Sequence, residues 1–167
     1  MLPYIKLPEL QLNTKEILSQ VLSSNQDDWE KLEWGQSIFK NLDCTVIKQK
    51  FHPVIQLYET PMMVMRFSPG TGLPIHKDNR RKAVIQIPLY NCESTPTFFY
   101  DEDHKPTYKI DWSENCAYMF DTHVNHNLQN DTNEERYMLF VPFFIQSFQT
   151  LSTLYRINKL FLRQQNP

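Results

Sequence analysis

Short hydrophobic runs, each bounded by turn-forming residues, fill the middle of this 167-residue chain. From about residue 44 they are rich in β-branched and aromatic side chains and recur about every ten residues, a pattern typical of a β-sandwich or barrel. No helical spacer separates them, which argues against a parallel α/β sheet. The pattern predicts strands near residues 45–50, 55–58, 62–67, 73–77, 82–90, 96–100, 107–111, 116–121, 124–129 and 136–145.

Both ends of the chain show helical spacing instead. Asn13 to Glu16 has the composition of a capping box, and apolar residues follow it at helical intervals. A second helix is predicted to begin near residue 25 or 27 and to carry Trp29 and Leu32; it includes Ile38 and Phe39 unless Gly35 ends or interrupts it. We expect one mainly β domain over residues 1–167, with a helical part over about 1–42, a β core over about 43–146 and a C-terminal helix over about 148–165.

Composition removes several classes of function. The three cysteines form no Cys-x-x-Cys motif, which argues against a disulfide framework or a thiolate zinc site, and the three glycines form no phosphate-binding loop. The net charge of −2 argues against a broadly basic nucleic-acid surface, and no apolar run is long enough to span a membrane. No secretory leader is visible, so we expect a cytoplasmic protein.

Two segments near predicted strand ends carry candidate metal ligands. His76 and Asp78 are two residues apart, so in an extended segment they point to the same side and can bind one metal ion. A solvated pair in a loop is the alternative for such a short motif. The Pro69–Gly72 turn and a short strand precede the pair, which is how a barrel presents ligands at its mouth.

The second segment contains His123 and His126, after the apolar run 117–120. His123 lies at the corner between two predicted strands, whereas His126 shares the inward parity of Val124 and Leu128. A buried imidazole without a partner is costly, and a histidine satisfied by the core is the common alternative. Because the first segment needs a third ligand, we predict that His126 supplies it.

Arg136 follows His126 across a polar loop, which predicts a hairpin with the two residues on adjoining strands. A guanidinium fork binds a carboxylate through two hydrogen bonds, although a position at the rim is the alternative. Two histidines and one carboxylate are the donor set of non-haem Fe(II) oxygenases, and they also occur at catalytic zinc sites. The chain has no HExxH motif.

The order of these motifs resembles the aspartyl/asparaginyl β-hydroxylase family of 2-oxoglutarate- and Fe(II)-dependent dioxygenases. The resemblance covers roughly residues 60–145. It rests on the Pro69-Gly70-Thr71 turn before His76, on Trp112, on Phe120-Asp121, and on His126 and Arg136. The resemblance implies a double-stranded β-helix, a cupin-like jelly roll, with flanking helices.

The resemblance also implies a set of site residues: Fe(II) held by His76 and His126, and 2-oxoglutarate anchored by Arg136 through its distal carboxylate. Vertebrate members have a glycine at the place of Asp78, so this chain offers the fuller triad His76, Asp78 and His126. Their arginine and histidine that help to hold the cosubstrate have no clear match here. The available replacements are Arg80, Arg81, Lys82 and Gln86, of which Gln86 has a parity that can point into the barrel.

The activity that the resemblance implies is hydroxylation, by molecular oxygen, of a C–H bond in an amino acid, a peptide side chain or another small molecule. The alternatives are a β-barrel module that binds carboxylates without catalysis and a zinc hydrolase on the same ligands. We predict that neither His52, which precedes Pro53, nor His104, in an acidic loop, binds the metal. The sequence leaves the substrate and the oligomeric state open.

Overall fold

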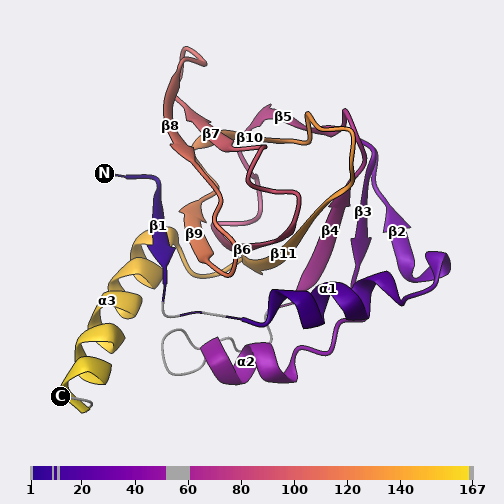
Figure 1. Ribbon diagram of the computed structural model, residues 1–167. Coiled ribbons are helices and arrows are strands. Elements are labelled where there is room, and N and C mark those ends of the chain that lie inside the picture. Colours follow the sequence, from indigo (N-terminus) through magenta and orange to yellow (C-terminus); the bar gives the residue numbers. More distant parts are fainter. Residues whose placement is uncertain (1, 9, 11, 52–60, 166–167) are drawn as a thin grey trace.

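Strands dominate the structure, a computed structural model that describes residues 2–8, 10, 12–51 and 61–165 (Figure 1). The strands are β1 (Tyr4–Leu7), β2 (Trp29–Lys31), β3 (Gln36–Phe39), β4 (Met63–Phe67), β5 (Gly72–His76), β6 (Ala83–Tyr90), β7 (Thr97–Tyr100), β8 (Pro106–Ile110), β9 (Ala117–Asp121), β10 (Asn125–Gln129) and β11 (Arg136–Phe143). The helices are α1 (Thr14–Leu22), α2 (Thr45–Phe51) and α3 (Phe148–Gln165), and η1 (Gln26–Asp28) is a short 3-10 helix.

The strands form two antiparallel sheets that pack face to face. The seven-stranded sheet has the order β1-β9-β6-β11-β4-β3-β2, and the four-stranded sheet has the order β5-β10-β7-β8. Side chains from both sheets share one apolar cluster between them. Along the chain, the strands from β4 to β11 pass repeatedly from one sheet to the other. This is the double-stranded β-helix, or jelly roll, that the resemblance implies, and the prediction of a mainly β fold is confirmed.

Side-chain parity along β6 and β11 separates two cores. Val84 and Phe140 point between the sheets. Ile85 and Leu139 point the other way, into a second cluster that includes residues of α1, α2 and α3. The three helices therefore cover the outer face of the seven-stranded sheet (Figure 1). Because both faces of these strands are covered, their sequences are nearly continuous apolar runs.

The turn before β5 fixes the register on which the candidate site depends. Gly70 has a φ of +68°, a left-handed conformation that glycine adopts without strain. Its N–H donates to the carbonyl of Asn130 at 2.9 Å, and the N–H of Asn130 donates to the carbonyl of Thr71 at 2.9 Å. A Cβ on Gly72 would lie 2.5 Å from the carbonyl oxygen of Leu128, so β5 and β10 approach closely there. A slip of one residue would turn the side chains of β5 to the opposite face.

The N-terminal part is only partly helical. Helix α1 is confirmed, and the Asn13 side chain accepts a hydrogen bond from the N–H of Glu16 at 3.3 Å. The second predicted helix is wrong, because β2 and β3 form a hairpin and β3 pairs with β4 in the seven-stranded sheet. Gly35, in the connection of that hairpin, has a φ of +77° and turns the chain back. β1 joins the same sheet through β9, so the β core begins well before residue 43.

The strand predicted at residues 45–50 is also wrong, because residues 45–51 form α2. The side chain of Asp43 accepts a hydrogen bond from the N–H of Thr45 at 3.0 Å where the helix begins. Ile47 and Phe51, four residues apart, lie on one face of the helix and are buried in the core beneath the seven-stranded sheet. The strand predicted at 55–58 lies outside the described residues. The remaining predicted strands are confirmed.

β10 and β11 do not form the predicted hairpin. β10 pairs with β5 and β7, whereas β11 pairs with β4 and β6 in the other sheet. The loop between them crosses from sheet to sheet. The side-chain amide of Asn130 holds this loop by donating to the carbonyls of Phe67 at 2.9 Å and Glu134 at 2.7 Å. A polar loop of this length is compatible with a hairpin or a crossing, so the sequence pattern does not separate the two.

The predicted C-terminal helix is confirmed as α3. Phe148, Leu151 and Tyr155 lie along one side of it and are buried against the seven-stranded sheet. Among the residues that the structure describes, no helix has the length and hydropathy required to cross a membrane. The assignment of residues 1–167 to a single domain stays a prediction.

Candidate active site

Two neighbouring strands of the four-stranded sheet bring His76 and His126 together. The two residues are paired across β5 and β10, and their ring centroids are 4.4 Å apart. His126 is 4% exposed and lies near the rings of Phe99 and Phe120. Its predicted inward orientation is confirmed. The pairing also explains the geometry, because directly opposed residues on adjacent strands point to the same side of a sheet.

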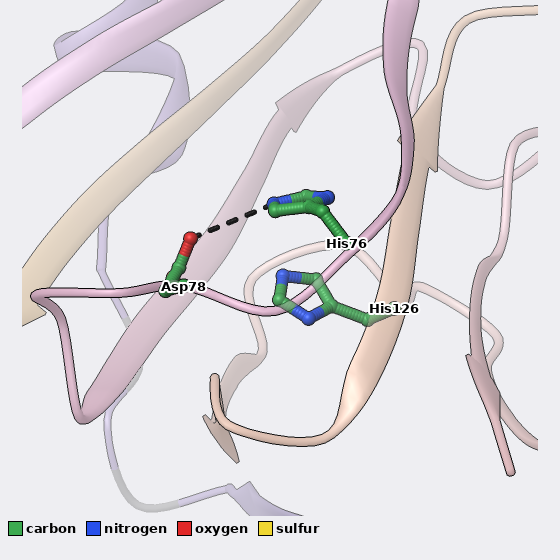
Figure 2. A group of neighbouring side chains, drawn as sticks. All are labelled: His76, Asp78 and His126. Carbon is green, nitrogen blue, oxygen red and sulfur yellow. Dashed lines mark ion pairs between the residues drawn. The ribbon is translucent and has the colours of Figure 1, made fainter. Parts of the chain in front are cut away.

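Asp78 completes a cluster of three potential ligands. It follows His76 by two residues, just after β5 ends, and its Oδ1 lies 3.5 Å from Nε2 of His76. One ligand atom from each of His76, Asp78 and His126 lies within 4.8 Å of the other two. Figure 2 shows the three side chains grouped around one point at the end of β5. The structure therefore brings together the three residues that the sequence selects.

Backbone carbonyl groups hold both imidazole rings. Nδ1 of His76 lies 2.8 Å from the carbonyl oxygen of Pro74, and Nδ1 of His126 lies 2.9 Å from that of Val124. Because a carbonyl oxygen can only accept, both Nδ1 atoms carry a proton and both Nε2 atoms keep a free lone pair in the neutral ring. The lone pair of His126 is thus available to a metal ion, and that of His76 is available when its Nε2, which faces Oδ1 of Asp78, carries no proton.

Arg81 holds the carboxylate of Asp78, and Thr122 holds the backbone of Asp78 and Arg81. Nε of Arg81 donates to Oδ2 of Asp78 at 2.6 Å, which leaves Oδ1 for a metal ion. The N–H of Asp78 donates to the carbonyl of Thr122 at 2.9 Å, and the Thr122 hydroxyl donates to the carbonyl of Arg81 at 2.5 Å. Sequence reasoning missed Thr122. It lies between the predicted strands that end and begin near His123, but a threonine carries no signal of such a role.

Electrostatic conditions favour the metal-binding forms of His126 and Asp78. Burial lowers the pKa of His126 to about 4, so this ring is neutral near pH 7. Burial acts to lower the pKa of His76, but hydrogen bonds to Asp78 and to the Pro74 carbonyl outweigh it, and the pKa is raised. Burial acts to raise the pKa of Asp78, but hydrogen bonds with His76 and Arg81 hold it well below its usual range. The cluster therefore offers a carboxylate and a neutral imidazole, the forms that bind metal ions.

Arg136 is fully buried between the sheets at the beginning of β11. Its Cζ lies 5.9 Å from the ring centroids of both Phe67 and Trp112. Nη1 donates to the carbonyl of Gln129 at 2.5 Å, at the end of β10, so the side chain reaches toward the strand that carries His126. Nε and Nη2 are buried and have no hydrogen-bond partner among the described residues. Burial lowers the pKa of this guanidinium.

The burial of Arg136 excludes the alternative of a rim position. A rim residue would be exposed to water, whereas this side chain has no exposed surface. A buried cation with two free donors destabilises a protein unless an anion pairs with it. A carboxylate matches the unused part of the guanidinium fork. The residue therefore fits an anchor for an acidic ligand between the sheets.

Gln86 is a second polar side chain in the interior. It is 2% exposed, and its Oε1 has no hydrogen-bond partner among the described residues. On β6 it pairs with Phe140 and Tyr118, which both belong to the cluster between the sheets. Its predicted inward parity is confirmed. Its binding to a cosubstrate stays a prediction.

The other candidates lie away from the cluster or outside the described residues. Arg80 and Lys82 are exposed and do not form part of the interior. His123 is exposed at the turn after β9, and His104 is exposed in a turn with a φ of +60°. His52 lies outside the described residues. Among the described residues, the cluster of possible metal ligands contains neither His104 nor His123.

Comparisons with known proteins identify the family. A model of the family described as Aspartyl/Asparaginyl beta-hydroxylase matches residues 9–145, most of the chain. This chain belongs to that family. The resemblance found in the motifs is therefore confirmed, and the protein is a member of a hydroxylase family. The comparison with curated proteins gives no significant match.

Solved structures share the fold of this β-hydroxylase family member at low sequence identity. A prolyl-4-hydroxylase from Pseudomonas putida aligns with a TM-score of 0.63 and 11% identity, over 87% of this chain and 94% of that one. A prolyl hydroxylase from Trichoplax adhaerens, in complex with a peptide fragment of hypoxia inducible factor, aligns with a TM-score of 0.65 and 15% identity, over 93% and 86%.

A 2OG-Fe(II) oxygenase family protein from Burkholderia pseudomallei aligns with a TM-score of 0.60 and 9% identity, over 84% of this chain and 83% of that one. At these identities the three likenesses establish the double-stranded β-helix and no more.

Proposed function

We propose that this protein is a 2-oxoglutarate- and Fe(II)-dependent oxygenase that hydroxylates a C–H bond of an amino acid, a peptide side chain or another small molecule. His76, Asp78 and His126 would hold the iron, and Arg136 would hold the distal carboxylate of 2-oxoglutarate. Membership of a hydroxylase family supports the reaction class. The observation that carries the proposal is the pairing of a three-ligand cluster with a buried guanidinium that has two free donors.

The donor set fits Fe(II). Two imidazoles and one carboxylate, with the other coordination positions open, form the facial triad of non-haem iron oxygenases. In this chain the second polar atom of each ligand is already held by Pro74, Val124 or Arg81, so the orientation of the ligands is fixed before a metal binds. When bound, the iron would supply the redox chemistry that transfers an oxygen atom from molecular oxygen to the substrate.

The interior fits a dicarboxylate. The free Nε and Nη2 atoms of Arg136 can each donate to one oxygen of a carboxylate, which pairs the buried charge. Gln86 offers a further polar group in the same interior. The remaining side chains between the sheets are largely apolar and exclude water from the reacting groups. The protein would thus orient the cosubstrate by its two ends.

Two alternative functions use the same residues and are separable by experiment. A zinc hydrolase would bind zinc on His76, Asp78 and His126 but would have no use for 2-oxoglutarate. A carboxylate-binding module would bind 2-oxoglutarate through Arg136 with or without metal. Only the oxygenase requires Fe(II) and 2-oxoglutarate to meet in one complex.

The test is an anaerobic titration of 2-oxoglutarate into the Fe(II)-loaded protein, followed by metal-to-ligand charge-transfer absorbance. We expect a saturable absorbance that His126→Ala abolishes. Binding of 2-oxoglutarate without this absorbance would favour the binding module, and an absence of binding would leave the zinc hydrolase. Mass spectrometry of amino acids and peptides incubated with the active protein then identifies the substrate by the gain of one oxygen atom.

A further inference from the structure

Trp112, one of the motif residues, has an unused hydrogen-bond donor in the interior. It lies between β8 and β9, is 4% exposed and packs edge to face on Tyr118, with ring centroids 5.0 Å apart. The Arg136 guanidinium is also close, with its Cζ 5.9 Å from the Trp112 ring centroid. Nε1 of Trp112 is buried and has no hydrogen-bond partner among the described residues.

Three buried donors therefore lack acceptors in one part of the interior. They are Nε1 of Trp112 and the Nε and Nη2 atoms of Arg136. An indole N–H can donate but cannot accept, so another donor such as a guanidinium cannot satisfy it. A buried donor without an acceptor lowers stability, and proteins rarely retain such groups without a functional reason. The missing partner of this group of donors is an acceptor.

A carboxylate has the required capacity. Its two oxygens offer about four acceptor positions, and a guanidinium fork uses only two of them. A third donor beside the fork can bond to the same carboxylate. Of the two rings on which the guanidinium packs, Trp112 carries such a donor and Phe67 has none. The thiol of Cys92, a further neighbour of the guanidinium, already donates to the carbonyl of Tyr137 at 3.2 Å.

We propose that the indole N–H of Trp112 donates a hydrogen bond to the distal carboxylate of 2-oxoglutarate, beside the fork of Arg136. This inference rests on the proposed function, since it assigns a second contact to the same cosubstrate. Trp112 is then a binding residue that distinguishes a dicarboxylate from a 2-oxo acid with only one carboxylate. The aromatic ring packs on Tyr118 in either case, so within the Trp112 side chain only the N–H adds to the discrimination that the Arg136 fork provides.

The first test compares two ligands on two variants. Trp112→Phe keeps an aromatic ring but removes the N–H, and Trp34→Phe, at a position 55% exposed, is the matched control. 2-Oxobutyrate can chelate the metal as 2-oxoglutarate does but has no distal carboxylate. Each ligand is titrated anaerobically into the Fe(II)-loaded proteins and followed by charge-transfer absorbance.

We expect Trp112→Phe to weaken 2-oxoglutarate binding about tenfold or more, the loss typical of one hydrogen bond to a charged group. Binding of 2-oxobutyrate should stay the same, and Trp34→Phe should change neither. Equal weakening of both ligands, or no weakening of either, would overturn the role of Trp112 and leave the proposed function intact. Failure of the wild-type protein to bind 2-oxoglutarate would instead overturn the proposed function.

A second test uses the wild-type protein and does not depend on the folding of a variant at position 112. The protein is labelled with ¹⁵N and loaded with diamagnetic Zn²⁺, and its three tryptophan indole resonances are recorded. The indole N–H resonance of Trp112 should move downfield on addition of 2-oxoglutarate and should not change on addition of 2-oxobutyrate.

The other two tryptophans are internal controls. Nε1 of Trp29 already donates to the hydroxyl of Ser24 at 3.2 Å, and Trp34 is exposed, so neither resonance should move. A Trp112 resonance that stays at a high-field position while 2-oxoglutarate is bound would show that its N–H points at the Tyr118 ring. That result would overturn the inference.

Discussion

Replacement of Arg136 by methionine separates the role of this residue in binding from its effect on stability. Methionine keeps much of the side-chain length and is apolar, so it suits the interior between the sheets. The native guanidinium is fully buried, and only its Nη1 has a hydrogen-bond partner among the described residues, the carbonyl of Gln129. We expect Arg136→Met to make the ligand-free protein more stable and to prevent its binding of 2-oxoglutarate.

The magnitude follows from the interactions that the substitution removes. Two buried donors without acceptors cost about 1–3 kcal/mol each, and the variant removes both. It also loses the bond to Gln129, about 1.5 kcal/mol, and the stacking of the guanidinium on two aromatic rings, about 0.5–1 kcal/mol each. At the midpoints of these ranges the gain is about 4 kcal/mol and the loss about 3 kcal/mol, so the free energy of unfolding should rise by about 1 kcal/mol. For a chain of this length the midpoint temperature should rise by roughly 2–4 °C.

Thermal and urea unfolding of the metal-free protein measure this increase, and Arg66→Met is the matched control. Arg66 lies on β4 opposite Tyr137, the residue after Arg136, but on the other face of the sheet. Its Cζ stacks 4.5 Å from the ring centroid of Trp29, and its Nε lies 3.8 Å from Glu135. Its Nε also has no hydrogen-bond partner among the described residues, but here that donor lies in an ion pair with Glu135. Because the replacement removes this ion pair, the stacking on Trp29 and the bond from Nη2 to the Ser37 hydroxyl, Arg66→Met should lower stability.

Addition of 2-oxoglutarate to the Fe(II)-loaded proteins, without oxygen, should make the wild type more stable than Arg136→Met. A ligand at one hundred times its dissociation constant stabilises the protein that binds it by about 2.7 kcal/mol, so the wild type should then exceed Arg136→Met. A variant that loses more than about 1 kcal/mol without ligand would show that the guanidinium is satisfied inside the protein. That outcome would refute the argument that Arg136 is retained for an acidic ligand.

Three further results are expected at the metal cluster and its supports. His126→Ala should lower the affinity for Fe(II) by more than the 10–100-fold that is typical when a residue that only supports a ligand is lost. The control His123→Ala should leave iron binding at equilibrium unchanged. If instead His123→Ala abolished binding and His126→Ala did not, His123 would be the ligand. Arg81→Gln should weaken iron binding about 10–100-fold because Oδ2 of Asp78 loses its partner. Arg80→Gln, at an exposed position, is the control, and equal iron affinities of the two variants would show that Arg81 does not support Asp78. Gly72→Ala should lower the free energy of unfolding by on the order of 2 kcal/mol and weaken iron binding, because the new Cβ would meet the backbone of Leu128 in β10. A variant with wild-type stability in urea unfolding would contradict the close approach of β5 and β10.

The strands of the jelly roll were predictable from residue 62 onward because tertiary packing agrees with the local pattern there. β6 and β11 are buried on both faces, so their apolar runs identify them directly. In the N-terminal region the local pattern predicted the wrong structure. Trp29 and Phe39 have spacing compatible with a helix, but they lie in β2 and β3 and pair across the hairpin. Pairing with a distant strand, here β4, decides this structure, and a local pattern does not contain that information.

The residues of the candidate site were predictable, but part of its geometry was not. His76, Asp78 and His126 are marked by residue type and by parity, and the structure brings them together. The hairpin that was expected to place Arg136 beside His126 does not form. Arg136 reaches the end of β10 through its bond to Gln129 instead, because the connecting loop crosses between the sheets. The role of Thr122 was not predictable either, because its hydroxyl bonds to the carbonyl of Arg81, a residue in a loop that is distant in the sequence.

Succinate formation from 2-oxoglutarate is the decisive measurement for the oxygenase function. The Fe(II)-loaded protein, supplied with 2-oxoglutarate and oxygen, should form succinate and carbon dioxide faster than free iron does, and a true substrate should raise the rate. His126→Ala and Arg136→Met should reduce the rate to that of free iron, and Zn²⁺ should not support the reaction. A protein that binds one Fe(II) and one 2-oxoglutarate but forms no succinate with any candidate substrate would contradict the proposed oxygenase.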